Sequence, residues 1–318
     1  MDIQTYEHKQ SDTRLLIQRA GTAERAILLI HGFLSSTFSW RFLFPLLSPY
    51  FTVYAVDLPG FGRSDKGRHY PYTLTAYAKS IHNFIQAEGI QTLTLMAHSM
   101  GGQVALRLAK LAPENVDRLV LIASSGYLPA AKRWHKLLLR LPFSYSIVPR
   151  LITKKRVDQQ LNAVYYNLKN IDIAETYEGY LTPLRDPAFP RALFKFARSR
   201  ESDLSSDMLQ QIEQPTLLIW GRYDRIIPLR IGERLLQVAS NRESDLSREQ
   251  LRQIEQPTLL LWGRHDRVVP LHVGQRLLRD LPNVRMEIIE QTGHVPMEEK
   301  PLDVMHRIAP FLDIPAVI

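Results

Sequence analysis

Short runs of apolar residues recur along the chain, and each run is bounded by polar or turn-forming residues. They cover residues 26–30, 51–56, 92–96, 118–123, 216–220 and 285–289. Such runs are too short for a helix that is stable on its own, and their continuous apolar character is typical of buried strands. The pattern therefore predicts a sheet whose strands are spread over most of the chain.

Segments with a helical spacing of apolar residues lie between these strands, at residues 73–87 and 100–111. Alternation of buried strands with amphipathic helices predicts a mostly parallel sheet with helices on both faces, which is the α/β class. In such sheets, ligands bind where the strands end, at the carboxyl edge. The loops that follow the strands are therefore where functional residues are expected.

Residues 126–199 depart from this rhythm, because they are rich in aromatic residues, Lys and Arg and are interrupted by prolines. We interpret them as a helical cap inserted between strands, with helices predicted at 134–141 and 157–168. The net charge of +8 arises here: residues 131–200 hold 14 Lys and Arg against five Asp and Glu, or +9, which leaves −1 elsewhere. This local basicity indicates a solvated face or attraction for anionic substrates or lipid surfaces, and no motif indicates a nucleic-acid partner.

Residues 200–241 and 242–283 form an internal repeat, in which 27 of 42 aligned positions are identical. A solenoid needs three or more repeats to bury its core, so two copies inside an α/β chain indicate one duplicated βα unit. The apolar strand of the spare copy must join the sheet, pack against the cap or dock onto another molecule, because a bare edge strand invites aggregation. The last of these predicts a strand-mediated homodimer.

These patterns divide the chain into a first core segment (1–125), the cap (126–199), the first repeat copy (200–241) and the second copy with the end of the core (242–318). The length of 318 residues, less 42 for one copy, leaves 276 residues. That is an ordinary size for one α/β domain with a cap insertion.

Composition excludes several kinds of chemistry. The chain contains no Cys, so it has neither disulfides nor a thiolate nucleophile nor a Cys-based metal site. The N-terminus lacks the apolar stretch of a signal peptide, and nowhere do the roughly 18 apolar residues of a membrane span occur together. We therefore expect a cytoplasmic protein with no stable membrane insertion, no cofactor and no metal ion.

Ser99 lies between the strand at 92–96 and the helix at 100–111, with small residues two positions away on either side, Ala97 and Gly101. This spacing is that of a nucleophile elbow, a sharp strand-to-helix turn that exposes the serine hydroxyl and tolerates only small neighbours. The N-terminus of the following helix directs N–H groups toward developing negative charge. The spacing favours Ser99 as a catalytic nucleophile.

With these motifs in place, the chain resembles the α/β-hydrolase family over nearly its whole length. The matching residues are His31-Gly32-Phe33, the run from Asp57 to Asp65, the elbow at Ser99, the two Gly-x-x-Asp motifs and Thr292-Gly293-His294. The resemblance is to the serine-nucleophile branch of carboxylesterases and lipases. It implies a Ser, acid and His triad in that chain order, beneath a cap.

The resemblance assigns a role to each matching residue. Ser99 would attack the substrate carbonyl, and His294 would take its proton and return it to the leaving group. The backbone N–H groups of Phe33 and Met100 would form the oxyanion hole. Side chains of Phe33, Leu34 and Met100 would line the substrate pocket. We interpret His31, Asp57 and Arg63 as residues that order loops.

The triad acid is ambiguous, because the repeat supplies both Asp224 and Asp266 after nearly identical strands. Asp266 precedes His294 by 28 residues and Asp224 precedes it by 70. One helix and one strand separate the acid from the histidine in the family, so the shorter interval favours Asp266, with Asp224 as its rival.

The predicted reaction is hydrolysis of a small carboxylic ester through an acyl-enzyme on Ser99. A serine at the elbow disfavours haloalkane dehalogenases and epoxide hydrolases, whose nucleophile is a carboxylate. A C–C bond hydrolase, lipase, thioesterase or perhydrolase would use the same triad. A catalytically silent binding module on this fold is the alternative from another class.

Overall fold

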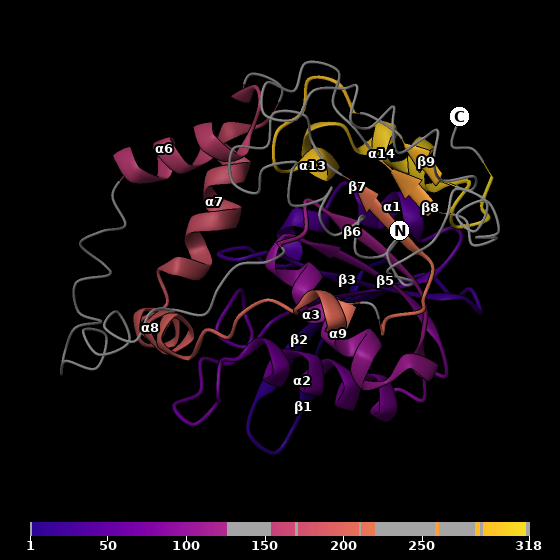
Figure 1. Ribbon diagram of the computed structural model, residues 1–318. Coiled ribbons are helices and arrows are strands. Elements are labelled where there is room, and N and C mark those ends of the chain that lie inside the picture. Colours follow the sequence, from indigo (N-terminus) through magenta and orange to yellow (C-terminus); the bar gives the residue numbers. More distant parts are fainter. Residues whose placement is uncertain are drawn as a thin grey trace.

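A computed structural model describes residues 2–125, 154–168, 171–209, 211–219, 258–260, 284–286 and 289–315 (Figure 1). Within these residues, nine strands form one sheet in the order β1-β2-β4-β3-β5-β6-β7-β8-β9. The pairs β1/β2 and β2/β4 are antiparallel, and all the other pairs are parallel. The predicted α/β class with a mostly parallel sheet is confirmed.

The first half of the sheet follows the apolar runs closely. Its strands are β1 (Gln4–Lys9), β2 (Arg14–Ala20), β3 (Ala26–Ile30), β4 (Thr52–Asp57), β5 (Leu93–His98) and β6 (Val116–Ile122). The antiparallel strands β1 and β2 were not predicted. Strand β1 is mostly exposed and carries almost no apolar pattern, whereas the apolar run of β2 is only three residues long, Leu15 to Ile17. Strand β2 pairs with β4 and so protects that edge of the parallel strands.

Helices cover both faces of the sheet (Figure 1). Along β3, Leu28 and Ile30 belong to one core cluster, which includes side chains of α2 (Leu74–Ala87) and α3 (Met100–Leu111). Ile27 and Leu29 point to the other face and share a cluster with helices α1 (Leu43–Leu47) and α14 (Pro301–Ile308). The alternation fixes the register, because a slip of one residue would exchange the two faces.

The carboxyl-terminal strands come from the repeat and the segment after it. They are β7 (Thr216–Ile219), β8 (Thr258–Leu260) and β9 (Val284–Met286). Strand β7 pairs with β6, β8 pairs with β7, and β9 pairs with β8, all in parallel. The strands of residues 200–241 and 242–283 are therefore neighbours in one sheet. Since both edges of β8 are paired, this strand gives no reason for a homodimer, which stays a prediction.

Three helices in the predicted cap region lie together beside the sheet (Figure 1). They are α6 (Lys154–Val164), α7 (Ile173–Leu184) and α8 (Phe189–Ser199). Helix α8 buries Phe189, Ala192 and Phe196 in the same cluster as α2 and α3. The helix predicted at 134–141 lies outside the described residues. In the part of the chain that is described, no helix has the length and apolar character that crossing a bilayer requires.

Candidate active site

Ser99 occupies a strained turn between β5 and α3. Its backbone has φ 51° and ψ −119°, in the left-handed half of the map that a residue with a side chain rarely adopts. The Ser99 N–H donates to Ile122 O at 3.0 Å, and the Ser99 carbonyl accepts from Gly102 N at 3.0 Å and from Ser125 N at 2.9 Å. The bonds to Ile122 and Ser125 attach the strained residue to β6 and the segment after it, and the bond from Gly102 comes from the first turn of α3.

Gly101 explains why the elbow needs a small residue two positions after the serine. A Cβ at Gly101 would lie 2.5 Å from Ile30 O and 2.6 Å from His31 O. Both atoms are main-chain carbonyls at the end of β3, so neither can rotate away. The close approach of α3 to β3 therefore requires glycine, and it sets Ser99 beside the loop that follows β3.

His294 meets Ser99 although 195 residues separate them in the chain. The distance from His294 Nε2 to Ser99 Oγ is 3.2 Å, and the two residues are 4% and 8% exposed. When the imidazole carries its proton on Nδ1, Nε2 can accept the hydroxyl proton of Ser99. The structure thus brings together two of the three residues expected for a triad.

The loop after β3 is ordered by a buried histidine, as the sequence interpretation held. The Leu58 N–H donates to His31 Nε2 at 3.0 Å, so the ring proton is on Nδ1, which donates to Gly32 O at 2.7 Å. Burial lowers the pKa of His31 and so favours this neutral form. The ring therefore fixes the start of the loop that carries Phe33 and Leu34.

Of the three predicted pocket residues, Phe33 and Leu34 lie in this loop and Met100 begins α3. Leu34 lines a small cleft bounded also by Phe61, Tyr180, Leu184 and Phe189. Phe33 is 43% exposed, and its ring stacks on that of Phe196 of α8 at 5.3 Å between ring centroids. Met100 is the first residue of α3, directly after the serine. The oxyanion roles of the Phe33 and Met100 N–H groups remain predictions.

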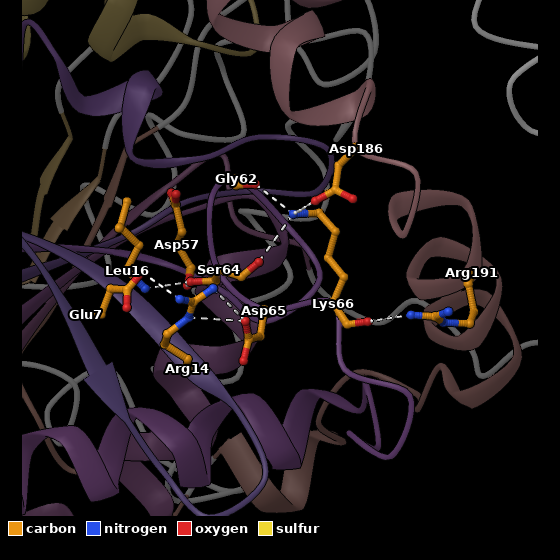
Figure 2. A network of polar contacts seen from close by, with 10 residues as sticks. All are labelled: Glu7, Arg14, Leu16, Asp57, Gly62, Ser64, Asp65, Lys66, Asp186 and Arg191. Atoms are coloured by element: carbon orange, nitrogen blue, oxygen red, sulfur yellow. Dashed lines mark hydrogen bonds and ion pairs between the residues drawn. The ribbon is translucent and has the colours of Figure 1, made fainter.

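Asp57 stabilises a turn, as the sequence predicts. Its Oδ1 accepts from Thr37 N at 2.6 Å and its Oδ2 accepts from Arg63 N at 2.8 Å. The Ser64 hydroxyl donates to Asp57 O at 2.5 Å and accepts from Leu16 N at 2.7 Å (Figure 2). These hydrogen bonds hold the turn between Asp57 and Ser64 and attach it to β2 through Leu16.

Lys66 connects this turn to the cap, and sequence reasoning missed it (Figure 2). Its Nζ donates to Gly62 O at 2.9 Å and Ser64 O at 3.2 Å and pairs with the Asp186 carboxylate at 3.0 Å. Arg191 of α8 donates to Lys66 O at 3.1 Å. The lysine side chain is only 4% exposed, whereas a lysine in a polar run is normally expected in solvent. No signal in the sequence marks this contact.

Glu298 is a second connection to the cap that the sequence does not reveal. It lies in α13 (Pro296–Glu299), just after His294, and is fully buried at its carboxylate. The carboxylate accepts hydrogen bonds from Arg41 Nη1 at 2.6 Å, from the Tyr165 hydroxyl at 2.8 Å and from the Tyr180 hydroxyl. Burial raises the pKa of Glu298, and the Arg41 charge opposes that rise.

Glu299 attaches the histidine loop itself to the end of α6. Its two oxygens accept from Gly293 N at 2.6 Å and from Tyr166 N at 2.9 Å. The His294 N–H donates to Val164 O at 2.7 Å, in the last residue of α6. Burial raises the pKa of Glu299 to about 7. The end of α6 and the histidine loop are therefore hydrogen-bonded to each other.

The remaining predicted residues, Asp224 and Asp266, both lie outside the described residues. The triad acid accordingly stays a prediction. Across the described segments, no three His, Asp or Glu side chains gather as a metal ion would require.

Comparison with known proteins places the chain among hydrolases. The alpha/beta hydrolase family profile matches residues 27–307. The uncharacterized hydrolase YugF of Bacillus subtilis (strain 168) is 32% identical over 310 residues, covering 96% of this chain and 93% of YugF. A thermophilic esterase from Thermogutta terrifontis has a TM-score of 0.68 at 20% identity, with 98% of each chain covered. The 2-hydroxy-6-oxo-6-phenylhexa-2,4-dienoate hydrolase of Rhodococcus sp. strain RHA1 has a TM-score of 0.67 at 21% identity, with 98% of this chain and 97% of that chain covered.

Proposed function

Because the chain belongs to the alpha/beta hydrolase family, we propose that it is a serine hydrolase that cleaves a small carboxylic ester through an acyl-enzyme on Ser99. The observation that carries the proposal is the 3.2 Å contact between Ser99 Oγ and His294 Nε2, at the carboxyl end of β5. A hydroxyl paired with a buried imidazole on a strained turn is the arrangement that activates a serine.

The proposed reaction has two halves. The Ser99 oxygen attacks the ester carbonyl carbon while its proton passes to His294 Nε2, and the negative charge moves to the carbonyl oxygen. The N–H groups of Phe33 and Met100 would stabilise that oxyanion. Collapse of the intermediate expels the alcohol, which takes the proton from His294. A water molecule then repeats the sequence on the acyl-enzyme and releases the acid.

The third triad residue is proposed to be one of the two aspartates. Asp224 follows β7, which pairs directly with β6, whereas Asp266 follows β8, one strand farther from β5. Adjacent strands are about 4.8 Å apart, so the strand order supports Asp224. The shorter chain interval to His294 supports Asp266 instead. We weigh the strand order more heavily, because a triad is a contact in space.

The test compares hydrolysis of 4-nitrophenyl butyrate with fluorophosphonate labelling in the parent protein and in Ser99→Ala. We expect the parent to show both and Ser99→Ala to show neither. A parent that is not labelled, or a Ser99→Ala variant that keeps the hydrolysis rate, contradicts the proposal. A silent binding module would give the first of these results.

The acid is identified by making Asp224→Asn and Asp266→Asn side by side. Loss of the triad carboxylate lowers kcat by a factor on the order of 10⁴ where it has been removed from a comparable triad. We expect that loss for Asp224→Asn and a nearly unchanged kcat for Asp266→Asn. The reverse result assigns the role to Asp266.

A further inference from the structure

His98 is the last residue of β5 and directly precedes Ser99. It is buried, and its Nε2 lies 2.9 Å from His294 O, with the two imidazole rings 4.8 Å apart at their centroids. A carbonyl oxygen can only accept, so the proton of His98 must be on Nε2. The nucleophile's neighbour in sequence is thereby joined to the main chain of the histidine.

We propose that His98 is a positioning residue, whose Nε2–H holds the main chain of His294 at the distance from Ser99 that proton transfer requires. The inference rests on the proposed serine hydrolase function. It is based on a short path between the two catalytic candidates. A peptide bond joins Ser99 to His98, and one hydrogen bond joins His98 to the carbonyl of His294.

The surroundings of His98 lock its ring in one orientation. A Cβ at Gly32 would lie 2.9 Å from His98 Nδ1 and 3.0 Å from Ser99 Cβ, so the glycine backbone packs directly against both residues. His98 Nδ1 is buried without a hydrogen-bond partner in the described part of the chain. A second proton on that nitrogen would have no acceptor there.

Electrostatics favour the same form. Burial, and then the neighbouring His294, hold the pKa of His98 well below its ordinary value. His98 therefore stays neutral with a fixed donor, whereas His31, on the other side of Gly32, uses its Nε2 as an acceptor. Two buried histidines thus serve as opposite tautomers around the same loop.

The His294 main chain is held at two atoms by different parts of the fold. Its N–H donates to Val164 O in the cap, and its carbonyl accepts from His98 in the core. Removing the second bond frees the loop to shift relative to Ser99. Misplacement of a catalytic group by about 1 Å can cost on the order of 10²-fold in rate.

The experiment compares His98→Gln with His98→Asn. The Nε2 amide of Gln reaches nearly as far as His Nε2, whereas the Asn amide ends at the position of Nδ1, so only Gln can restore the bond to His294 O. We expect His98→Asn to lower kcat for 4-nitrophenyl butyrate by about 10- to 100-fold with KM changed less than about twofold. We expect His98→Gln to retain kcat within about fivefold.

Equal losses in both variants, an unchanged kcat in His98→Asn, or an effect on KM alone would overturn the inference. If neither variant folds, nitrogen NMR of the parent decides, because the proposal requires the neutral ring of His98 to carry its proton on Nε2. A parent without Ser99-dependent activity would refute the proposed function, and the NMR result would still report on the His98 bond.

Discussion

Glu298 and Arg41 form a buried ion pair that joins the core to the loop after His294. Its contribution to the free energy of unfolding can be tested by removing one or both charges. The Glu298 carboxylate has no exposed surface and the Arg41 side chain is 14% exposed. Glu298→Gln keeps the size of the side chain but leaves the arginine without its counter-charge. Loss of one partner of a buried pair costs about 3–5 kcal/mol.

The other contacts of Arg41 determine how much stability Glu298→Gln should lose within the range of about 3–5 kcal/mol. Arg41 also contacts the Glu175 carboxylate at 3.4 Å and lies 3.9 Å from the ring centroid of Phe38. These contacts partly compensate its charge, so we expect about 3 kcal/mol for Glu298→Gln. In Arg41→Met/Glu298→Gln no buried charge is left without a partner, because Glu175 is 49% exposed, and the double variant should be more stable than Glu298→Gln by at least about 1 kcal/mol.

Urea unfolding followed by circular dichroism measures the stability of Glu298→Gln relative to the parent and that of the double variant relative to Glu298→Gln, provided that the m-value is unchanged. Ser99→Ala serves as the control, since it leaves the pair intact. The reasoning is refuted if the double variant loses the sum of the two single losses, because additivity would mean that the charges act independently. It is also refuted if Glu298→Gln is as stable as the parent.

Three further outcomes follow from the cap contacts and the elbow. Lys66→Met removes the charge that pairs with Asp186, and we expect KM for 4-nitrophenyl butyrate to rise more than kcat falls, measured by steady-state kinetics. Gly101→Ala forces a Cβ against main-chain carbonyls, and we expect a loss of about 1–3 kcal/mol in urea unfolding together with a lower kcat. Because the pKa of Glu299 rises from 4.5 to about 7 on folding, its contribution to stability is fully present below pH 4.5 and is lost as the pH rises through 7. Glu299→Gln should flatten that part of the stability curve, as measured by unfolding at pH 5 and pH 8.

Much of the fold could be predicted because strands that are buried on both faces of a parallel sheet consist of short apolar runs. The run at 26–30 coincides with β3, and the helix at 100–111 coincides with α3. Strand β1 escaped prediction because an exposed edge strand needs no apolar pattern. The order of β7 and β8 escaped it for another reason: nearly identical strands give no local signal of which one lies beside β6.

The candidate site divides in the same way. Ser99 could be singled out because the elbow imposes a steric spacing that is visible in the sequence, whereas His294 was expected only from the resemblance to a family; the structure brings the two side chains together. Lys66, Glu298 and His98 could not be assigned their contacts, because a buried polar side chain is stabilised by partners far away in the chain. Each of these residues looks like an ordinary surface or core position until the partner's place is known.

The bond from His294 N to Val164 O means that the histidine amide belongs to the cap's docking surface as much as to the active site. Detachment of α6 would expose that amide to solvent, so its hydrogen-exchange rate reports how often the cap undocks. A compound that binds preferentially to the detached α6 would therefore inhibit hydrolysis from outside the active site. By linkage, that compound and a substrate that favours the docked state would each weaken the binding of the other by the same factor.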